Sequence, residues 1–328
     1  MHFIGNDVSK KTLDIACFDK ARKRWSKPCK VSNTKSGWDV LIGWAEKQTQ
    51  APPEAICIVM EATGVYHVKA ASYLSKAGLN VIVTNPGRSA EYAKSQNRLN
   101  KSDKLDAQSL QRYGSQLQKY HWFIPDLPEI SQLRALLARL RQLGKDLQRE
   151  RNRLEKCAFQ EGSRWAQSSV QRQIKAITRE QKLAQHQIDQ LIKDNANLKR
   201  DQDLMCSIKG IGKITSQWLL PLLSAQRFNS AREVAAFLGL VPCHKSSGTS
   251  LKTRGKLSGR GNADLRARLY MPAMSAARTD PEMKTFYQGL LAKGKPKKAA
   301  LTAVMRKLVH VCYGVVKHQT PYIENYAA

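Results

Sequence analysis

The chain has 328 residues, of which 42% are hydrophobic and 25% are charged, and its formal net charge is +29. This hydrophobic content is that of a globular protein and excludes a largely disordered chain, while the length predicts two or three domains. Because no apolar run reaches the ~18 residues of a membrane helix and the first residues lack a signal-peptide pattern, we expect a cytoplasmic protein with no membrane partner.

The first 125 residues alternate strand-like and helix-like segments. Residues 54–64 include a continuous apolar run, typical of a buried parallel strand, and Ser36 is a candidate N-cap for the first helix. We predict strands over residues 2–9, 12–19 and 24–32, a helix over 36–48, a strand over 54–64, a helix over 68–77 and a strand over 79–86. The pattern indicates an α/β domain with a mixed sheet whose first three strands form an antiparallel meander.

A long helical segment occupies the middle of the chain, residues 126–203. Leucines recur there at steps of three and four residues among Arg, Gln, Glu and Lys, and there is no proline between Ile130 and Leu198. This spacing predicts two amphipathic helices that form an antiparallel coiled-coil hairpin with its turn near Gly162. Such a hairpin is more typical of oligomerisation or domain spacing than of catalysis.

The last segment, residues 204–328, is predicted to be a compact helical domain. It has 20 basic and 5 acidic residues and so carries over half of the net charge of +29. Such an excess attracts a polyanion, and nucleic acid is the most abundant polyanion in a cytoplasm. A generally basic surface is the alternative. The segment begins with a turn of the helix-hairpin-helix kind, in which Gly210 and Gly212 lie between Lys209 and Lys213. Backbone N–H groups of such a turn can bind a DNA phosphate, although the turn could also just join two packed helices.

A loop rich in Ser, Gly, Lys and Arg follows, over residues 243–264, and helices are predicted over residues 265–278 and 299–316. Between these helices lies a basic run, residues 293–298. From the turn, the loop and the basic run, we predict a set of nucleic-acid-binding residues: Lys209, Gly210, Gly212, Lys213, Lys252, Arg254, Lys256, Arg260, Lys295, Lys297 and Lys298.

Four acidic residues of the first 125 are candidates for catalysis. Asp7 and Glu61 each end a predicted strand, and Asp103 and Asp106 are three residues apart on one face of a helix. Carboxylates at strand ends and on a neighbouring helix can converge at one edge of a sheet, and oxygen ligands of this kind suit Mg²⁺ or Mn²⁺. Two such ions could activate a phosphodiester. The alternative is that Asp103 caps its helix and Asp7 belongs to a turn.

Five segments of the chain share motifs with a known protein family. They are IGNDVSK (4–10), MEATGVY (60–66), NPGRSAEYAKSQNRLNKSDKLDAQSL (85–110), SIKGIGKITS (207–216) and the segment 235–274. These motifs are similar to those of the DEDD insertion-sequence transposases. That family includes bridge-RNA-guided recombinases and is related to the Piv/MooV DNA invertases. The resemblance covers nearly the whole chain. One departure is Asn6, since an apolar residue usually precedes the first Asp.

The resemblance implies an RNase H-like (RuvC-like) fold for residues 1–125, with Asp7, Glu61, Asp103 and Asp106 as the metal-binding tetrad. It also implies a serine nucleophile in the domain 204–328. The match through LGLVPCHKSSG (238–248) assigns that role to Ser247, and a shift of the match would assign it to Ser246, Thr249 or Ser250. The implied partners are donor and target double-stranded DNA, a noncoding bridge RNA and further copies of the chain in a dimer or tetramer.

The residues leave other functions open. A hydrolytic nuclease of the resolvase type would use the same acids, with Ser247 only contacting phosphate. A DNA invertase would need no RNA guide. A non-catalytic nucleic-acid-binding protein would need only the glycine turn and the coiled coil. A sugar kinase is a further alternative, because its fold opens with a similar strand pattern. The charge of residues 204–328 and the lack of a later phosphate-binding loop argue against the kinase.

Overall fold

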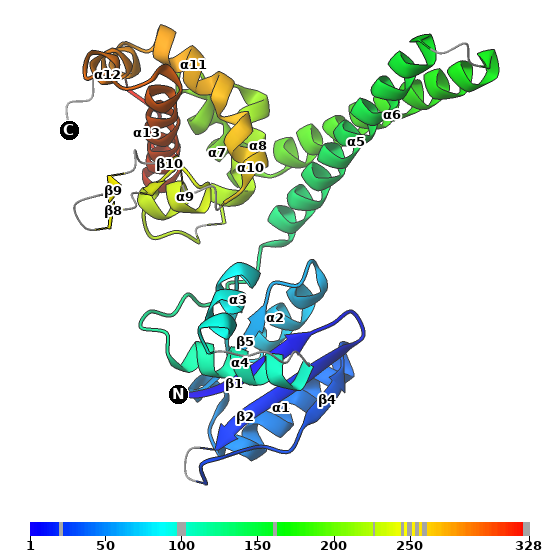
Figure 1. Cartoon of the computed structure of the whole chain (residues 1–328), viewed down its shortest axis with the longest axis vertical. Coiled ribbons are helices and arrows are strands. Elements are labelled where there is room, and N and C mark those ends of the chain that lie inside the picture. Colours follow the sequence, from blue (N-terminus) through cyan, green and yellow to red (C-terminus); the bar gives the residue numbers. More distant parts are fainter. Residues whose placement is uncertain are drawn as a thin grey trace. The chain divides into compact units, whose positions relative to one another are not determined.

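The structure is a computed structural model of the chain, and it describes residues 1–19, 22–96, 103–159, 163–225, 227–243, 246–247, 251–252, 256–257 and 261–323. The chain divides into two compact units, Met1–Pro125 and Asp126–Ala328, each of which we describe by itself (Figure 1). The first unit contains a mixed α/β arrangement and the second is helical apart from four two-residue strands.

The first unit is built on a six-stranded mixed sheet. Its strands are β1 (His2–Val8), β2 (Thr12–Asp19), β3 (Arg24–Trp25), β4 (Cys29–Ser32), β5 (Ile56–Glu61) and β6 (Asn80–Thr84). The order is β3-β2-β1-β5-β6, with β4 also paired to β2. The β1–β2 pair is antiparallel and the β1–β5 and β5–β6 pairs are parallel, so the predicted mixed sheet and meander are confirmed.

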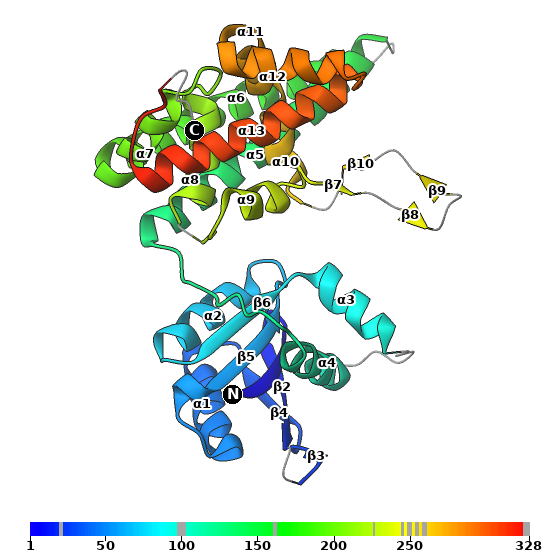
Figure 2. The ribbon, with the colours of Figure 1, turned by 90° about the vertical axis from the view of Figure 1, so that its left-hand side faces the viewer.

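Helices cover both faces of this sheet, as Figure 2 shows. On one face, α1 (Lys35–Thr49) and α2 (Tyr66–Lys76) pack Leu41 and Leu74 against Ile58 and Met60 of β5. On the other face, α4 (Asp103–Ser115) places Leu110 against a second apolar cluster. A short 3-10 helix (Pro53–Ala55) precedes β5, and α3 (Pro86–Ser95) follows β6.

Two local predictions for this unit were wrong. Residues 24–32 form two strands instead of one, and Pro28, which lacks an N–H for the ladder, lies in the gap between β3 and β4. The N-cap of α1 is Thr34, whereas Ser36 lies within the first turn of the helix. Thr34 and Ser36 are both residue types that cap helices, which explains why the sequence alone placed the N-cap two residues too late.

The second unit begins with the predicted helical hairpin, α5 (Pro128–Phe159) and α6 (Arg164–Asp194), whose helices pack along each other. Gly162, at the predicted turn, lies outside the described residues. At the base of the hairpin, Ile130, Leu133, Ile188 and Ile192 are buried and join the helical core. The hairpin is therefore packed into the second unit through these apolar side chains.

The rest of the second unit is a helical bundle. Its helices are α7 (Ala196–Cys206), α8 (Lys213–Leu223), α9 (Ala231–Phe237), α10 (Ala263–Arg268), α11 (Tyr270–Thr279), α12 (Pro281–Ala292) and α13 (Lys297–His318). By length and composition α13 could cross a membrane, but half of its apolar window is buried in the protein. Leu301, Val304, Leu308 and Cys312 of α13 belong to the bundle core, which explains the hydropathy of this helix.

The structure corrects three predictions in the second unit. The segment predicted as one helix over residues 265–278 is two helices, because Pro272 cannot donate to the carbonyl of Arg268 and the helix breaks there. Helix α12 was not predicted, although Asp280 caps it by accepting from the Met283 N–H and Pro281 occupies its first position. The loop after α9 contains short strands, described below.

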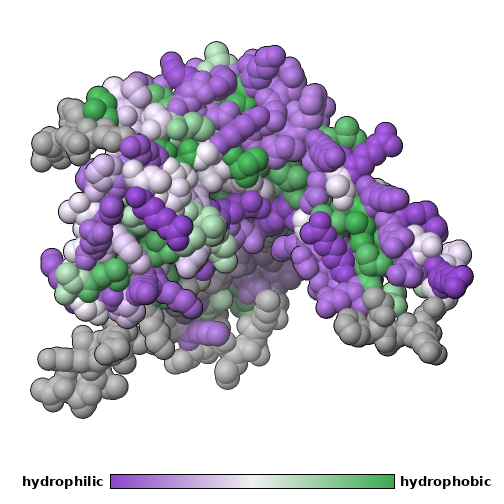
Figure 3. All heavy atoms as spheres, turned by 90° about the horizontal axis from the view of Figure 1, so that it is seen from above, coloured by the Kyte–Doolittle hydropathy of each residue, from purple (hydrophilic) through white to green (hydrophobic). Residues whose placement is uncertain are grey.

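The face of the molecule in Figure 3 is mostly hydrophilic, with apolar residues in small patches.

Candidate active site

A row of polar side chains crosses the sheet where β1 and β5 end. Asp7 of β1 lies opposite Asp14 of β2, and Glu61 of β5 lies opposite Thr84 of β6. Because Asn6 pairs with Met60 in the parallel β1–β5 ladder, Glu61 follows next to Asp7. Paired residues of neighbouring strands point to the same face of a sheet, so these side chains share the face that α4 covers.

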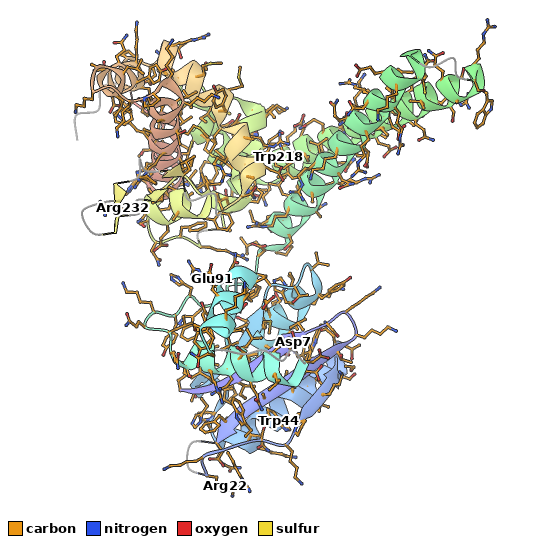
Figure 4. The ribbon with its side chains drawn as sticks, in the orientation of Figure 1. Asp7, Arg22, Trp44, Glu91, Trp218 and Arg232 are labelled. Atoms are coloured by element: carbon orange, nitrogen blue, oxygen red, sulfur yellow. The ribbon has the colours of Figure 1, made fainter. Side chains whose placement is uncertain are left out.

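Helix α4 lies close to this row because β1 carries a glycine beneath it. A Cβ atom at Gly5 would stand 1.8 Å from the Ala107 carbonyl oxygen and 2.6 Å from the Gln111 backbone nitrogen, so only glycine permits this approach. Asp103 and Asp106 occupy the first turn of α4. The helix thus brings its two acidic residues over the strand that holds Asp7. Figure 4 labels Asp7 beside α4.

The electrostatics of Asp7 reflect this crowding. Its pKa is raised from 3.8 to about 6, first by burial and then by the negative charges of Asp106, Asp103, Asp14 and Glu61. Desolvation and like charges both disfavour an ionised carboxyl group. The structure therefore brings the four predicted acids within electrostatic range of one another and adds Asp14 to them.

Two further side chains contact the acids. The Ser89 hydroxyl donates a hydrogen bond of 2.7 Å to Glu61 Oε2, and it comes from α3, just after β6. Lys30 of β4 places its Nζ 3.0 Å from Asp14 Oδ2 and 3.8 Å from Asp103 Oδ2. Sequence reasoning missed Asp14, Lys30 and Ser89, because only strand register and the packing of α3 bring them to the site. The alternation in TLDIACFD was the one available signal for Asp14.

The arrangement offers oxygen ligands without a preformed metal cage. Within the parts of the chain that the structure describes, no three His, Cys, Asp or Glu side chains are gathered closely enough to hold an ion as they stand. The donor set itself suits a hard divalent cation, since it consists of carboxylates. Burial, and then repulsion among these carboxylates, raise the pKa of Asp7. Binding an ion would require side-chain rotations, which the exposed Asp103 at the start of α4 allows.

Asn6, the departure from the family pattern, lies beside Asp7 in the chain and is fully buried. Neither its Nδ2 nor its Oδ1 has a hydrogen-bond partner among the described residues. Strand alternation directs it to the opposite face of the sheet from Asp7. Asn6 is therefore part of the core beneath α1 and α2, and the acid row does not depend on its amide.

The glycine turn predicted to bind phosphate lies between α7 and α8. Gly210 has φ +94°, and a Cβ there would be 2.6 Å from the Pro272 carbonyl oxygen, so this glycine serves packing against α11. Gly212 is the N-cap of α8 and has open space around it. Lys213 Nζ lies 2.8 Å from Asp189 Oδ2 of α6. Lys209 lies in the turn itself. Gly210 of the turn thus has a clear structural role, while Lys209, Gly212 and Lys213 are exposed.

The serine-rich segment contains two short antiparallel pairs. β7 (Pro242–Cys243) pairs with β10 (Lys256–Leu257), and β8 (Ser246–Ser247) pairs with β9 (Leu251–Lys252). In this register Ser246 is the partner of Lys252 and Ser247 that of Leu251. Arg254, Arg260, Thr249 and Ser250 lie outside the described residues. The predicted nucleophile is therefore carried on a β-hairpin instead of an irregular loop.

The predicted basic run is divided between a bend and a helix. Lys295 lies between α12 and α13, and Lys297 and Lys298 form the first turn of α13, where all three are exposed. Cations at a helix N-terminus are unfavourable for the helix dipole. Helix stability therefore does not explain why lysines occupy the first turn of α13. Binding to an anionic partner is a reason for lysines at this place.

Comparison with known proteins identifies the family. Residues 4–160 match a family model described as "Transposase", of the DEDD IS110 type, and residues 202–288 match the "Transposase IS116/IS110/IS902 family". The chain is 32% identical to the pilin gene-inverting protein of Moraxella bovis over 98% of this chain and 97% of that protein, and the corresponding protein of Moraxella lacunata is equally similar. A 43.6 kDa protein of insertion element IS110 from Streptomyces coelicolor is 30% identical over 36% of this chain and 29% of its own. The chain therefore belongs to the IS116/IS110/IS902 family of transposases and is a DNA recombinase of the transposase and invertase type.

Proposed function

We propose that the chain cuts and rejoins DNA of an insertion sequence, using an RNase H-like acid site in the first unit and a serine nucleophile in the second. The observation that carries the proposal is the geometry of the acid row, in which strand register places Glu61 beside Asp7 and the first turn of α4 brings two more carboxylates to them. Burial, and then the charges of these neighbours, raise the pKa of Asp7 to about 6. A basic protein that gathers acids at one edge of its sheet, at a cost in repulsion, needs a cation there.

Asp7, Glu61, Asp103 and Asp106 would hold that cation, which we propose to be Mg²⁺ or Mn²⁺. When bound, a divalent ion of this kind polarises a phosphodiester and stabilises the negative charge that develops on its oxygens. The contribution of the chain is to hold the carboxylates in position. Gly5 lets α4 approach, and Ser89 orients Glu61 through its hydrogen bond.

Ser247 is the proposed nucleophile. Its hydroxyl oxygen would attack the scissile phosphorus and lose its proton, while the bond from phosphorus to a deoxyribose oxygen breaks and that oxygen leaves as a hydroxyl. The phosphoserine so formed conserves the bond energy, and attack by a hydroxyl of another strand would release the serine and rejoin DNA. Lys252, the register partner of the adjacent Ser246, supports this assignment because it brings positive charge to the hairpin.

Donor and target DNA are the proposed substrates, and a structured bridge RNA is the proposed guide. The net charge of +29 supports binding to both, since each contact with a phosphate releases counterions. A homodimer or homotetramer would provide two or more copies of each site for strand exchange. The nucleic-acid-binding residues named from the sequence remain proposals, and exposed Lys295, Lys297 and Lys298 are the best supported of them.

A covalent-adduct assay tests the mechanism. Purified protein is incubated with supercoiled plasmid carrying the native element in Mg²⁺, denatured, and analysed for protein linked to DNA and for the modified peptide. We expect an adduct on Ser247 that is lost in Ser247→Ala and retained in Ser246→Ala. DNA breakage that survives in Ser247→Ala, without an adduct in the wild type, would contradict the serine mechanism and favour a hydrolytic nuclease.

Site-specific inversion is a second candidate, and the similarity to pilin gene-inverting proteins over 98% of the chain favours it. Transposition and inversion differ in the DNA product and in whether an RNA guide is used. Expression with native flanking DNA, followed by sequencing of RNA bound to the purified protein, separates them. One abundant structured RNA from the flank supports guided transposition, whereas heterogeneous RNA together with inverted junctions supports an invertase that reads DNA by itself.

A further inference from the structure

A lysine is built into the acid row. Lys30 is the register partner of Asp14 in the β2–β4 ladder, so backbone pairing fixes both residues beside Asp7. Its Nζ lies 3.0 Å from Asp14 Oδ2 and 3.8 Å from Asp103 Oδ2. One ammonium group thus contacts a carboxylate of the sheet and a carboxylate of α4 at the same time.

The two ion pairs differ in their surroundings. The Asp14 side chain is 18% exposed, whereas those of Lys30 and Asp103 are 53% and 68% exposed. The pKa of Lys30 is raised, first by the hydrogen bond to Asp14 and then by the charge of Asp14, with smaller contributions from Asp103 and Asp7. Asp14 is therefore the anchor of Lys30, and the ammonium reaches from there toward the more exposed Asp103.

We propose that Lys30 is a positioning residue that serves as the resident counter-ion of the acid site and competes with a divalent cation for it. The ammonium balances part of the negative charge of the row when no ion is bound, and it holds Asp103 toward the sheet. Asp14 acts through Lys30, as the acid that keeps this lysine in the row. The proposal rests on the proposed metal site and adds two residues to it.

The chemistry of a lysine at this position supports competition. An ammonium group and a divalent cation seek the same carboxylate oxygens, and like charges a few ångströms apart repel each other. When the ion enters, Lys30 can turn outward on its long flexible side chain, because more than half of that side chain is exposed. The site would then tolerate both states, one balanced by Lys30 and one by the ion.

The test is a Mn²⁺ titration of the full chain without DNA at pH 8, with free Mn²⁺ measured by its electron paramagnetic resonance signal. This readout does not depend on recombination. We expect Lys30→Met to bind Mn²⁺ about tenfold more tightly than the wild type, because a repelling charge is lost. Lys30→Arg, which keeps the charge, should bind as the wild type does. Lys47→Met is the charge-matched control, since Lys47 is an exposed residue of α1 on the other face of the sheet.

Asp14→Asn completes a double-mutant cycle with Lys30→Met. If Asp14 acts through Lys30, Asp14→Asn should change Mn²⁺ affinity at least threefold less in the Lys30→Met background than in the wild type. Equal affinity of the wild type and Lys30→Met, or an equal gain in Lys47→Met, would overturn the counter-ion role while leaving the metal site intact. Failure of the wild type and of Lys30→Met to bind Mn²⁺ would overturn the metal site and, with it, the counter-ion.

Discussion

The two units of the chain handle charge in opposite ways. The first collects acids in one row, fixed by strand register and by the close approach of α4 at Gly5. The second spreads basic residues over turns, a hairpin and the first turn of α13. Acids that must meet need a rigid scaffold, whereas a long polyanion can be contacted at many separate points. The first unit should therefore be sensitive to single substitutions and the second to the number of charges removed.

The largest effect is expected at the centre of the acid row. Asp7→Asn or Glu61→Gln should lower DNA rearrangement at least 10³-fold without unfolding the protein, because both carboxylates are proposed metal ligands. The measurement is quantitative amplification of recombined junctions in cells, with protein abundance followed in parallel. Glu54→Gln, at an exposed position before β5, is the matched control and should retain activity. Rearrangement at the wild-type level in Asp7→Asn would remove the acid row from the mechanism.

The next effect concerns the scaffold. Gly5→Ala should lower the free energy of unfolding by about 3 kcal/mol or more, because the new Cβ would lie 1.8 Å from the Ala107 carbonyl oxygen and would push α4 away. Urea denaturation measures this change. Gly43→Ala in α1, where nothing lies within 4 Å of the new Cβ, should instead be stabilising by about 0.5–1 kcal/mol. Similar stability of the two variants would show that α4 does not depend on Gly5.

A third prediction uses pH. The pKa of Asp7 is about 6 in the folded chain against an ordinary 3.8, so the folded state holds this proton more tightly than the unfolded state. The free energy of unfolding of the metal-free protein should therefore fall as pH rises from about 4 to about 6, and remain lower above that. The variant Asp7→Asn has no carboxyl group at this position and should not lose stability in this way. It should be more stable than the wild type by about 2 kcal/mol at pH 8, and the two should have nearly the same stability below pH 4. Denaturation in EDTA at both pH values checks it. A less stable variant at pH 8 would contradict the crowding of charges around Asp7.

The smallest effect per residue is expected in the second unit. Replacing Lys295, Lys297 and Lys298 together by Gln should weaken binding to non-specific duplex DNA about tenfold and reduce the slope of log K against log salt by about 3. The matched control replaces three lysines of the first unit, Lys47, Lys69 and Lys76, and should change both quantities less. Titrations at several salt concentrations make the measurement. Equal losses in the two triple variants would mean that net charge alone, and not its location, governs binding.

The fold of the first unit was largely predictable because its signals are local. The apolar run of residues 54–64 indicated a buried strand, and the period-2 pattern of residues 12–19 indicated the second strand of the meander. Pro28 was an available signal for the break between β3 and β4 and was not used. The N-cap of α1 was misplaced because Thr34 and Ser36 have similar capping preferences. In the second unit, Pro272 and the Asp280–Pro281 pair were available signals for a helix break and a helix start, and they were not used.

The candidate site was predictable only in part. The acids at strand ends could be found because a carboxylate directly after a buried strand is unusual, and the resemblance to a family added Ser247. Asp14 and Lys30 could not be found, because their place in the row follows from the pairing of β2 with β1 and β4, which the chain does not encode at a fixed spacing. For the glycine turn, the packing of Gly210 against α11 requires knowledge of a helix some 60 residues further along the chain.

A Mn²⁺ titration of purified wild type and Asp7→Asn at pH 8 tests whether the acid row holds a divalent cation. We expect saturable binding to the wild type and an affinity at least tenfold lower in Asp7→Asn, with Glu54→Gln behaving as the wild type. Equal binding to the wild type and Asp7→Asn, or no binding to either, would contradict a cation site in the acid row.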